Sequence, residues 1–417
     1  MIRILSILLT LSLIVNVLLS LDSDMYNFTF LTPFKYIILL IIGAIAIFYI
    51  KNNSVVIRKD IFMKLLIVMF FLMIFFGTLF SADPWNSMIR GLYMLIIFFD
   101  IYFLVGVLKF EKIINLIFNF FLFTGVIIAL ISDYYILIGD SRVFEMGNFK
   151  SIFVNANTFG ALLALFMLPA TMWKIKSLQN KLYILASFLL FSNLVFLLIL
   201  THSRAAILSF AIIVFFFIYF SYFKWSRNSI RNFTLLSLGT FVILISLFNY
   251  GKTNLITGYF MSKYEFQDTT NVFSTREALW NERLKGIEAR LYTGWGYGIN
   301  SRNYLEQAID DKTEKGNTIL SILEEFGIFI GSLIVLIMTV IVFSLFRKVK
   351  YLKNNFMYMI LLVIVLSSLI HVNFESWLFY LGNVNAFVFW IMLISLMNYS
   401  NKNLNKHPIE QFSGNIK

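Results

Sequence analysis

The fold class is decided by Ile61-Phe-Met-Lys-Leu-Leu-Ile-Val-Met-Phe-Phe-Leu-Met-Ile-Phe-Phe-Gly-Thr-Leu-Phe80, in which Lys64 is the only charged side chain. A helix of about 20 apolar residues crosses the roughly 30 Å hydrocarbon core of a bilayer. Further segments of this kind lie at about 4–21, 34–50, 88–107, 114–136, 154–173, 182–200, 205–223, 232–249, 326–346, 356–373 and 378–398. The sequence therefore predicts an all-α, polytopic integral membrane protein with about 12 transmembrane helices.

The composition of the chain excludes a soluble globular protein. Of the 417 residues, 59% are hydrophobic and only 13% are charged. Average soluble proteins have roughly 45–50% apolar and about 25% charged residues, so too few polar side chains are present to cover a surface exposed to water. The chain also has no cysteine, which excludes disulfides, thiolate metal sites and cysteine nucleophiles.

Lysine and arginine in the connecting segments predict the orientation of the helices, because cytoplasmic loops of membrane proteins are enriched in both. With the N-terminus in the cytoplasm, the inner side carries twenty of these residues and the short outer segments carry five. We therefore expect both termini inside (N-in/C-in). The predicted parts are helices one to nine in 1–249, an extracytoplasmic loop at 250–325, helices ten to twelve in 326–398 and a cytoplasmic tail at 399–417.

The net charge of +12 is explained by this topology. The predicted inner side has an excess of seventeen positive charges, the outer side has an excess of four negative charges, and Asp100 lies within the membrane. The positive charge thus belongs to the inner leaflet, and no nucleic-acid partner is expected. The only long connection is 250–325, and no Walker-type GxxxxGK[ST] motif occurs in the chain, so we expect the chemistry on the outer side.

The loop 250–325 contains a predicted amphipathic helix. Ser274 and Glu277 form a capping box, which satisfies free N–H groups at a helix start. An apolar stripe at helical spacing follows, consisting of Trp280, Leu284, Ile287 and Leu291. Three arginines spaced seven residues apart lie beside the stripe: Arg276, Arg283 and Arg290. Such a row suits the oxygens of a lipid-linked phosphate or pyrophosphate; an interfacial helix whose arginines only touch lipid headgroups is the alternative.

Directly after this helix comes Gly294-Trp-Gly-Tyr-Gly298. Alternating glycines allow sharp bends, and Trp295 and Tyr297 offer flat faces on which a sugar ring can stack. A tight turn with aromatic side chains at the membrane interface is the alternative. The loop ends at Glu324 and Glu325, which either act as a general base or cap the helix boundary. Two further candidates for the base are Glu288 and His371.

Other outer segments contribute cations and amides. Thr201-His-Ser-Arg204 is a four-residue turn between two predicted helices, which holds Arg204 at the membrane surface, where an arginine needs an anionic partner. Arg142 is another cation, and Asn155 and Asn157 supply amides at the start of the helix 154–173. Asp22-Ser-Asp24 matches the D-x-D pattern with which some lipid-sugar glycosyltransferases hold a divalent cation, although a solvated loop is the simpler interpretation.

Two predictions concern charges near or within the bilayer. Asp100 is the one deep charge, and Lys64 is its expected partner. We favour a structural ion pair over a proton relay, because relays usually contain several carboxylates. His371 and Glu375 lie at the outer end of the helix 356–373, where they can face the same chamber as Arg204; a satisfied interfacial histidine is the simpler interpretation.

Five pieces of the chain together resemble the O-antigen ligase and polysaccharide polymerase family of bacterial membrane glycosyltransferases. They are Phe153-Val-Asn-Ala-Asn157, Ser203-Arg-Ala-Ala-Ile-Leu208, Arg276…Trp280, Gly294-Trp-Gly-Tyr-Gly298 and Asn317…Gly327, and they occur in the family's order within about 150–345. The resemblance implies that Arg204 contacts lipid pyrophosphate and that Arg276 is the arginine of the long outer loop. At Gly316 the family's ligases typically carry a histidine, which is absent here, so ligation to a lipid A core is disfavoured.

The resemblance implies a polymerase that joins polyprenyl-pyrophosphate-linked repeat units at the outer face of a bacterial cell membrane. Its partners are the lipid-linked glycan and membrane lipid, with a flippase and a chain-length regulator as further expected partners; no cofactor and no metal are expected. The proposed catalytic residues are Arg204, Arg276 and Glu324, and the proposed substrate-binding residues are Arg142, Asn157, Arg283, Arg290, Trp295, Tyr297 and Asn317. The alternatives are ligase-type transfer to another acceptor and a flippase or exporter of the same glycans, which would need a polar path through the bilayer.

Overall fold

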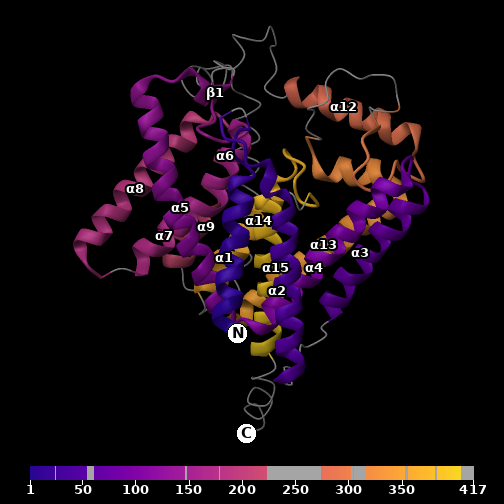
Figure 1. Ribbon diagram of the computed structural model, residues 1–417, viewed down its shortest axis with the longest axis horizontal. Coiled ribbons are helices and arrows are strands. Elements are labelled where there is room, and N and C mark those ends of the chain that lie inside the picture. Colours follow the sequence, from indigo (N-terminus) through magenta and orange to yellow (C-terminus); the bar gives the residue numbers. More distant parts are fainter. Residues whose placement is uncertain are drawn as a thin grey trace.

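The computed structural model describes residues 1–23, 25–53, 61–145, 148–177, 179–222, 274–301, 304, 316–352, 356–380 and 383–404. Its regular structure is almost entirely helical (Figure 1). The α-helices are α1 (Ile2–Leu18), α2 (Thr32–Asn52), α3 (Ile61–Leu79), α4 (Pro84–Val107), α5 (Phe110–Ile138), α6 (Ala156–Leu162), α7 (Leu168–Ser177), α8 (Lys181–Leu200), α9 (Arg204–Tyr222), α12 (Ser274–Ala289), α13 (Thr318–Leu352), α14 (Phe356–His371) and α15 (Val384–Leu404).

Short turns and one hairpin lie between some of these helices. The 3-10 turns η1 (Thr29–Leu31) and η2 (Ser141–Val143) precede α2 and the hairpin, respectively. The hairpin pairs β1 (Phe144–Glu145) with β2 (Asn148–Phe149) in antiparallel register. No larger sheet is present among the described residues, so the predicted all-helical class is confirmed.

The predicted membrane segments coincide with described helices except for 232–249, which lies outside the described residues. Six described helices are long and apolar enough to cross a membrane, and five further apolar helices are shorter. Large apolar side chains face outward from these helices; Phe71, Leu130 and Phe343 are 62%, 66% and 61% exposed. Apolar surface of this extent marks contact with a membrane. The total of twelve spans stays a prediction.

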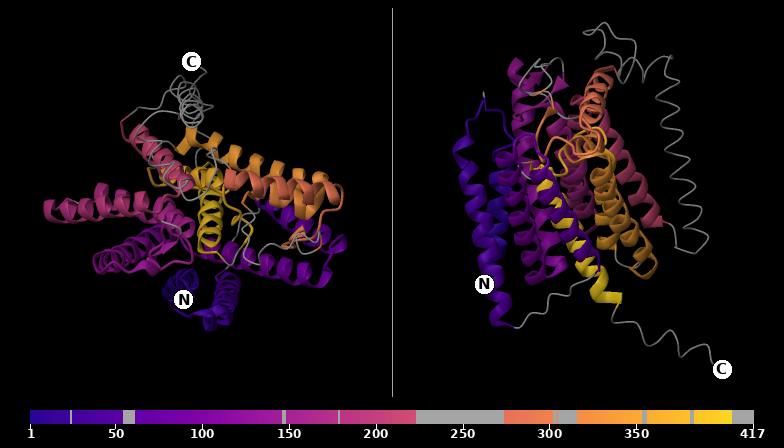
Figure 2. Two further views of the ribbon diagram at one scale, coloured as in Figure 1. Left: turned by 90° about the horizontal axis from the view of Figure 1, so that it is seen from above. Right: turned by 90° about the vertical axis from the view of Figure 1, so that its right-hand side faces the viewer.

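The helices form a bundle whose two ends differ. The start of α1 and the end of α15 lie at one end, whereas α12 lies at the opposite end (Figures 1 and 2). Helices α14 and α15 run through the middle of the bundle, and Ile364 and Ile391 in them are 0% exposed. The predicted topology requires the termini and the loop helix at opposite ends, as observed, and which end faces the cytoplasm stays a prediction.

The predicted helix at 154–173 contains a change of helical type. Helix α6 passes into the π-helical turn η3 (Leu163–Met167), which passes into α7. This change lies just before Pro169, which has no N–H to donate to the preceding turn. Every residue of η3 is 0% exposed, so this irregular turn is enclosed by protein.

Helix α13 is broken at Gly327, where the backbone angles are φ 71° and ψ 172°. The part before the break, which begins at Thr318, lies at the same end of the molecule as α12 (Figure 1). The predicted boundary between the outer loop and the membrane helix, at residues 325 and 326, coincides with this break. The break determines where the glycine-rich segment after α12 binds to α13, as described below.

The predicted ion pair between Lys64 and Asp100 is wrong. Lys64 is exposed on α3, whereas Asp100 is 7% exposed and its Oδ2 has no hydrogen-bond partner among the described residues. Asp100 faces α2 instead, where a Cβ on Gly43 would overlap its Oδ1. The absent side chain of Gly43 therefore makes room for the carboxyl group. Helical spacing places Lys64 within a span, but it does not tell which way the side chain points.

Candidate active site

The segment Gly294–Gly298 forms a sharply bent, tightly packed loop after α12. Its three glycines have φ angles of 69°, 107° and 72°, a backbone region that side chains disfavour. A Cβ at Gly294 would overlap the carbonyl of Glu325, and a Cβ at Gly296 would overlap Ser81 Oγ. The predicted tight turn is therefore present, and the glycines let it fit between α13 and the connection from α3 to α4.

The break in α13 provides the hydrogen-bond acceptors for this loop. In an unbroken helix Ile328 N–H would donate to the carbonyl of Glu324. Instead, Ile328 N donates to Leu291 O at 2.8 Å, Trp295 N donates to Glu324 O at 3.0 Å and Gly296 N donates to Glu325 O at 2.9 Å. Gly327 thus frees two carbonyls that bind the glycine loop, which explains why the two elements occur together.

The two aromatic side chains of the loop are engaged inside the protein. Trp295 is 5% exposed, its Nε1 donates to Gly286 O at 2.8 Å, and the Arg290 guanidinium lies 4.6 Å from its ring centroid. Tyr297 donates to Phe379 O at 2.7 Å and stacks on Phe326. Burial, with the charge of Glu325, raises the pKa of Tyr297, so its hydroxyl stays a donor. These contacts hold the loop in place, and sugar stacking stays a prediction.

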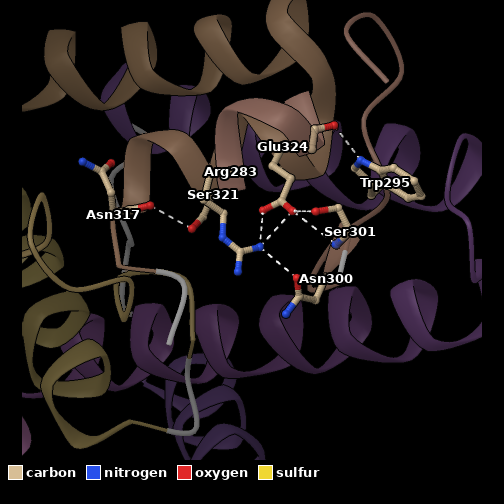
Figure 3. A network of polar contacts seen from close by, with 8 residues as sticks. Arg283, Trp295, Asn300, Ser301, Asn317, Ser321 and Glu324 are labelled. Atoms are coloured by element: carbon tan, nitrogen blue, oxygen red, sulfur yellow. Dashed lines mark hydrogen bonds and ion pairs between the residues drawn. The ribbon is translucent and has the colours of Figure 1, made fainter. Parts of the chain in front are cut away.

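Helix α12 is fixed to α13 by a buried ion pair. Arg283 Nη1 lies 2.8 Å from Glu324 Oε2 and 2.9 Å from Oε1, and both side chains are 0% exposed. The same nitrogen donates to Asn300 Oδ1 at 2.8 Å, and the hydroxyl of Ser301 bonds Glu324 Oε1 (Figure 3). Gly286 packs on this network, since a Cβ there would lie 3.0 Å from Glu324 Oε1.

This network changes the interpretation of the arginine row. Arg283 faces the protein interior together with Gly286 and Ile287, whereas Leu284 of the predicted apolar stripe is 44% exposed. Sequence spacing shows which residues share a side of a helix. It does not reveal the partner that stabilises a buried arginine, because Glu324 is 41 residues away in the chain. Arg283 therefore joins two helices, and its predicted role in binding substrate stays a prediction.

Glu324 is likewise surrounded by protein donors. Its carboxylate accepts hydrogen bonds from the Arg283 guanidinium, from Ser301 N at 3.2 Å and from Ser301 Oγ. A carboxylate with these donors and no exposed surface is well placed to hold α12 on α13. Its predicted role as a catalytic residue is untested.

Asn317 fastens the start of α13 to the segment that follows α14. Its Oδ1 accepts from Leu320 N at 3.0 Å, which caps the helix. Its Nδ2 donates to Asn373 O at 2.9 Å, and Thr318 N donates to Val372 O at 3.0 Å. The outer end of α13 is therefore fixed against residues 372–375.

A first cavity of about 340 Å³ opens beside this junction. It lies between α2, α4, the glycine loop and α13, and its charged lining residues are Arg90 and Glu325. The Arg90 guanidinium donates a hydrogen bond to Gly298 O. Apolar residues such as Ile97 and Phe326 complete the wall, so the cavity can take a ligand with both polar and apolar parts.

A second cavity of about 160 Å³ adjoins the first, because Ser376 and Tyr380 line both. Its lining is more polar and comes from α6, the end of α14, the connection between α14 and α15, and the start of α15. The residues that matter below are Asn157, His371, Glu375, Trp377, Asn383 and Asn385. Asn157 thus lies where the sequence predicted an amide, and the structure brings His371 and Glu375 to the same cavity.

The predicted arginines Arg204, Arg142 and Arg276 belong to three different elements, α9, η2 and α12. Arg204 is the first residue of α9, after a turn in which His202 has a φ of 51°. Helix α6 packs closely on this turn, since a Cβ at Gly160 would lie 2.9 Å from Ser203 Cβ. Arg142 has a 67% exposed side chain and pairs with Asp140 at 2.7 Å. Arg276 lies in the first turn of α12, and its side chain is outside the described residues.

No group of three histidine or acidic residues in the described part of the chain is arranged to hold a metal ion. Of the two aspartates in the D-x-D segment, Asp22 is described and its carboxylate pairs with Lys150, whereas Asp24 lies outside the described residues. A solvated loop, the simpler interpretation of the two, does not describe Asp22, which is 7% exposed.

Part of the chain is similar to a known protein family. Residues 186–335 match the family model described as O-Antigen ligase. This stretch is similar to an O-antigen ligase domain. The predicted resemblance to the O-antigen ligase and polymerase family is thereby confirmed over residues 186–335. A comparison with curated proteins finds no match.

The O-antigen ligase match covers only some of the candidate site. It includes Arg204, Arg276, the glycine loop, Asn317 and Gly327. The two cavities also use residues outside it, such as Asn157, Glu375 and Asn385. Sequence reasoning missed Arg90, Asn383 and Asn385 as lining residues. The only signal was their position, polar side chains at the predicted outer ends of apolar segments.

Proposed function

We propose that this chain is a polymerase that joins polyprenyl-pyrophosphate-linked oligosaccharide repeat units at the outer face of a bacterial cell membrane. The observation that carries the proposal is the pair of adjoining cavities at the α12 end of the bundle. One combines Arg90 with apolar walls, and the other is lined by amides, a carboxylate and aromatic rings. A glycan polymerase needs two such neighbouring sites, because donor and acceptor are both lipid-linked glycans.

The choice of polymerase over ligase rests on Gly316. In the family's ligases a histidine typically stands there, whereas in this chain the residue is a glycine with a φ of 68°. Any side chain at this backbone angle would be strained, so the position is adapted to the absence of a side chain. Polymerases of the family vary more at this position, which favours repeat-unit polymerisation.

In the proposed reaction a hydroxyl of the acceptor sugar attacks the anomeric carbon of the donor, and polyprenyl pyrophosphate leaves. Arg204 and Arg276 neutralise the negative charge that develops on the leaving group; loss of one fixed group of this kind costs about 3 kcal/mol in the barrier. Arginine serves this role because its guanidinium forms two parallel hydrogen bonds to phosphate oxygens. We propose that no metal ion is required, since these cations supply the charge.

Deletion of the protein in its host tests this function. We expect single repeat units, still linked to the polyprenyl carrier, to accumulate on the outer leaflet, and a plasmid copy of the intact protein to restore polymer. Accumulation on the inner leaflet would instead identify a flippase and would refute the proposal. Complementation with Arg204→Ala should leave the single units in place.

A further inference from the structure

The second cavity contains a buried amide that has no side-chain hydrogen bond to any described residue. Asn385 is 0% exposed, and within the described part of the chain neither its Oδ1 nor its Nδ2 has a hydrogen-bond partner. An unsatisfied polar group of this kind costs about 1–3 kcal/mol, and Asn385 lines the cavity wall. Its oxygen accepts and its nitrogen donates, the combination that a hydroxyl group satisfies. The orphaned amide therefore points to a ligand that carries hydroxyl groups.

The rest of the lining fits a sugar ring. Asn157 and Asn383 add further amides, and Trp377 and Tyr380 add aromatic rings. Sugars present hydroxyls around their edge and C–H groups on their faces, so amides and aromatic rings recognise complementary parts of them. The neighbouring first cavity has the arginine and the apolar wall instead. The second cavity therefore fits the reacting sugar of the acceptor better than the first cavity does.

The protonation of His371 follows from its partner. Trp377 Nε1 lies 3.1 Å from His371 Nδ1, and an indole N–H can only donate. Nδ1 must therefore be the acceptor, which places the proton of a neutral imidazole on Nε2. His371 can donate from Nε2 into the cavity, but in this state it cannot take up a proton there, which argues against it as the base.

Glu375 is the one carboxylate among the described residues that line the second cavity. It is 6% exposed, and its backbone carbonyl accepts from Thr318 Oγ1 at 3.3 Å. This contact fixes residue 375 relative to the outer end of α13. Glu325, the other carboxylate at the site, lines only the first cavity.

We propose that the second cavity binds the acceptor sugar, that Asn385 bonds its hydroxyl groups, and that Glu375 is the general base of the transfer; this inference rests on the proposed polymerase function. Glu375 takes the proton of the attacking hydroxyl. The hydroxyl oxygen forms the new bond to the anomeric carbon, and the bond between that carbon and the phosphate oxygen breaks. Polyprenyl pyrophosphate leaves with the electron pair, so protons and charges balance.

The test uses purified full-length protein and lipid-linked repeat units extracted from the deletion strain. Removal of a general base lowers the rate by about 10²–10⁴-fold, so Glu375→Gln should lose at least about a hundredfold in kcat. Glu375→Ala should regain activity when formate is added, because formate fits the space left by the side chain and can accept the proton. Thermal unfolding of each variant in detergent shows whether it is folded.

Two comparisons keep the assignment falsifiable. Glu111→Gln removes an exposed carboxylate from the first turn of α5 and should keep the wild-type rate. Glu325→Gln removes the carboxylate of the first cavity and thereby tests the competing candidate for the base. A folded Glu375→Gln variant with the wild-type rate would overturn the base assignment, as would formate rescue of Glu325→Ala in place of Glu375→Ala. Inactivity of Arg204→Ala in the same assay would still support the polymerase function, whereas an inactive wild-type protein would refute that function itself.

Discussion

Arg283 of α12 and Glu324 of α13 form an ion pair in which both side chains are fully buried and Nη1 lies 2.8 Å from Oε2. The pair joins the loop helix to a membrane helix beside the glycine loop (Figure 3). Removing one member of a buried pair leaves an uncompensated charge, which costs about 3–5 kcal/mol. Replacement of both members by apolar residues of similar size costs much less.

Arg283→Met should therefore lower the temperature of thermal unfolding in detergent strongly, because Glu324 is left buried without its cation. The double variant Arg283→Met/Glu324→Leu should recover much of the loss. Glu288→Gln, an exposed change on the same helix, should shift stability by no more than about 0.5 kcal/mol. Equal unfolding temperatures for Arg283→Met and the wild type would show that the pair contributes nothing.

Gly327→Ala should destabilise the protein and reduce polymer synthesis. Its φ of 71° and ψ of 172° lie in a region that essentially only glycine adopts, where a side chain costs about 1–3 kcal/mol, and its Cβ would also overlap the carbonyl of Tyr292. Gly139→Ala is the comparison: Gly139 has φ 67° and ψ 32°, a left-handed conformation that side chains tolerate better, and nothing lies within 4 Å of its Cβ. Thermal unfolding should therefore show a much smaller loss of stability for Gly139→Ala than for Gly327→Ala. Equal losses of stability in the two variants would show that the close approach of Gly327 to Tyr292 is not needed.

Arg204→Ala should abolish most polymer synthesis, by about 10²–10³-fold in kcat. The proposed cause is lost stabilisation of the pyrophosphate leaving group. Arg3→Ala removes an exposed arginine at the other end of the bundle and serves as the control. Polymer length and yield are read from gels of extracted glycan. Unchanged polymer in cells that carry Arg204→Ala would remove this arginine from the mechanism.

Asp100→Asn should leave the unfolding temperature unchanged or raise it. The carboxyl group has no ionic partner among the described residues, so the substitution breaks no pair. Lys64→Ala should have little effect as well, since Lys64 is exposed. By contrast, Gly43→Ala should be disruptive because its Cβ would overlap Asp100. A large loss of stability in Lys64→Ala would restore the ion pair predicted from sequence.

Treatment of the purified protein with EDTA should leave the rate of polymerisation unchanged. The basis is the proposed use of arginine cations, together with the pairing of Asp22 with Lys150, which occupies one carboxylate of the D-x-D segment. Loss of activity with EDTA and its return with added Mg²⁺ would show that a metal ion takes part.

Much of the fold follows from sequence because each helix of a membrane protein must satisfy its own backbone hydrogen bonds. Apolar length alone therefore locates helices such as α3 and α5. Apolar length does not show how each helix is rotated about its axis, and for this reason the predicted partner of Asp100 is wrong. Nor does it give the start of α13 at Thr318, because the segment before Gly327 contains Glu324 and Glu325 and lacks the composition of a membrane span.

Only those parts of the candidate site that depend on local sequence could be predicted. The glycine loop, Asn157 and the outer carboxylates were recognised because turns and caps have local signatures. The inward position of Arg283 was not predicted, since it depends on Glu324 from another helix. The second cavity combines α6, α15 and the connection between α14 and α15, and only the tertiary packing of these segments brings Asn157, Glu375 and Asn385 together.

The most direct measurement is the mass spectrum of glycan released after purified wild-type protein is incubated with lipid-linked single repeat units. The account predicts a series of masses spaced by one repeat unit, together with released polyprenyl pyrophosphate. No series is expected with Arg204→Ala. If the wild-type protein yields only the single unit while remaining folded, the proposal that this chain polymerises repeat units is contradicted.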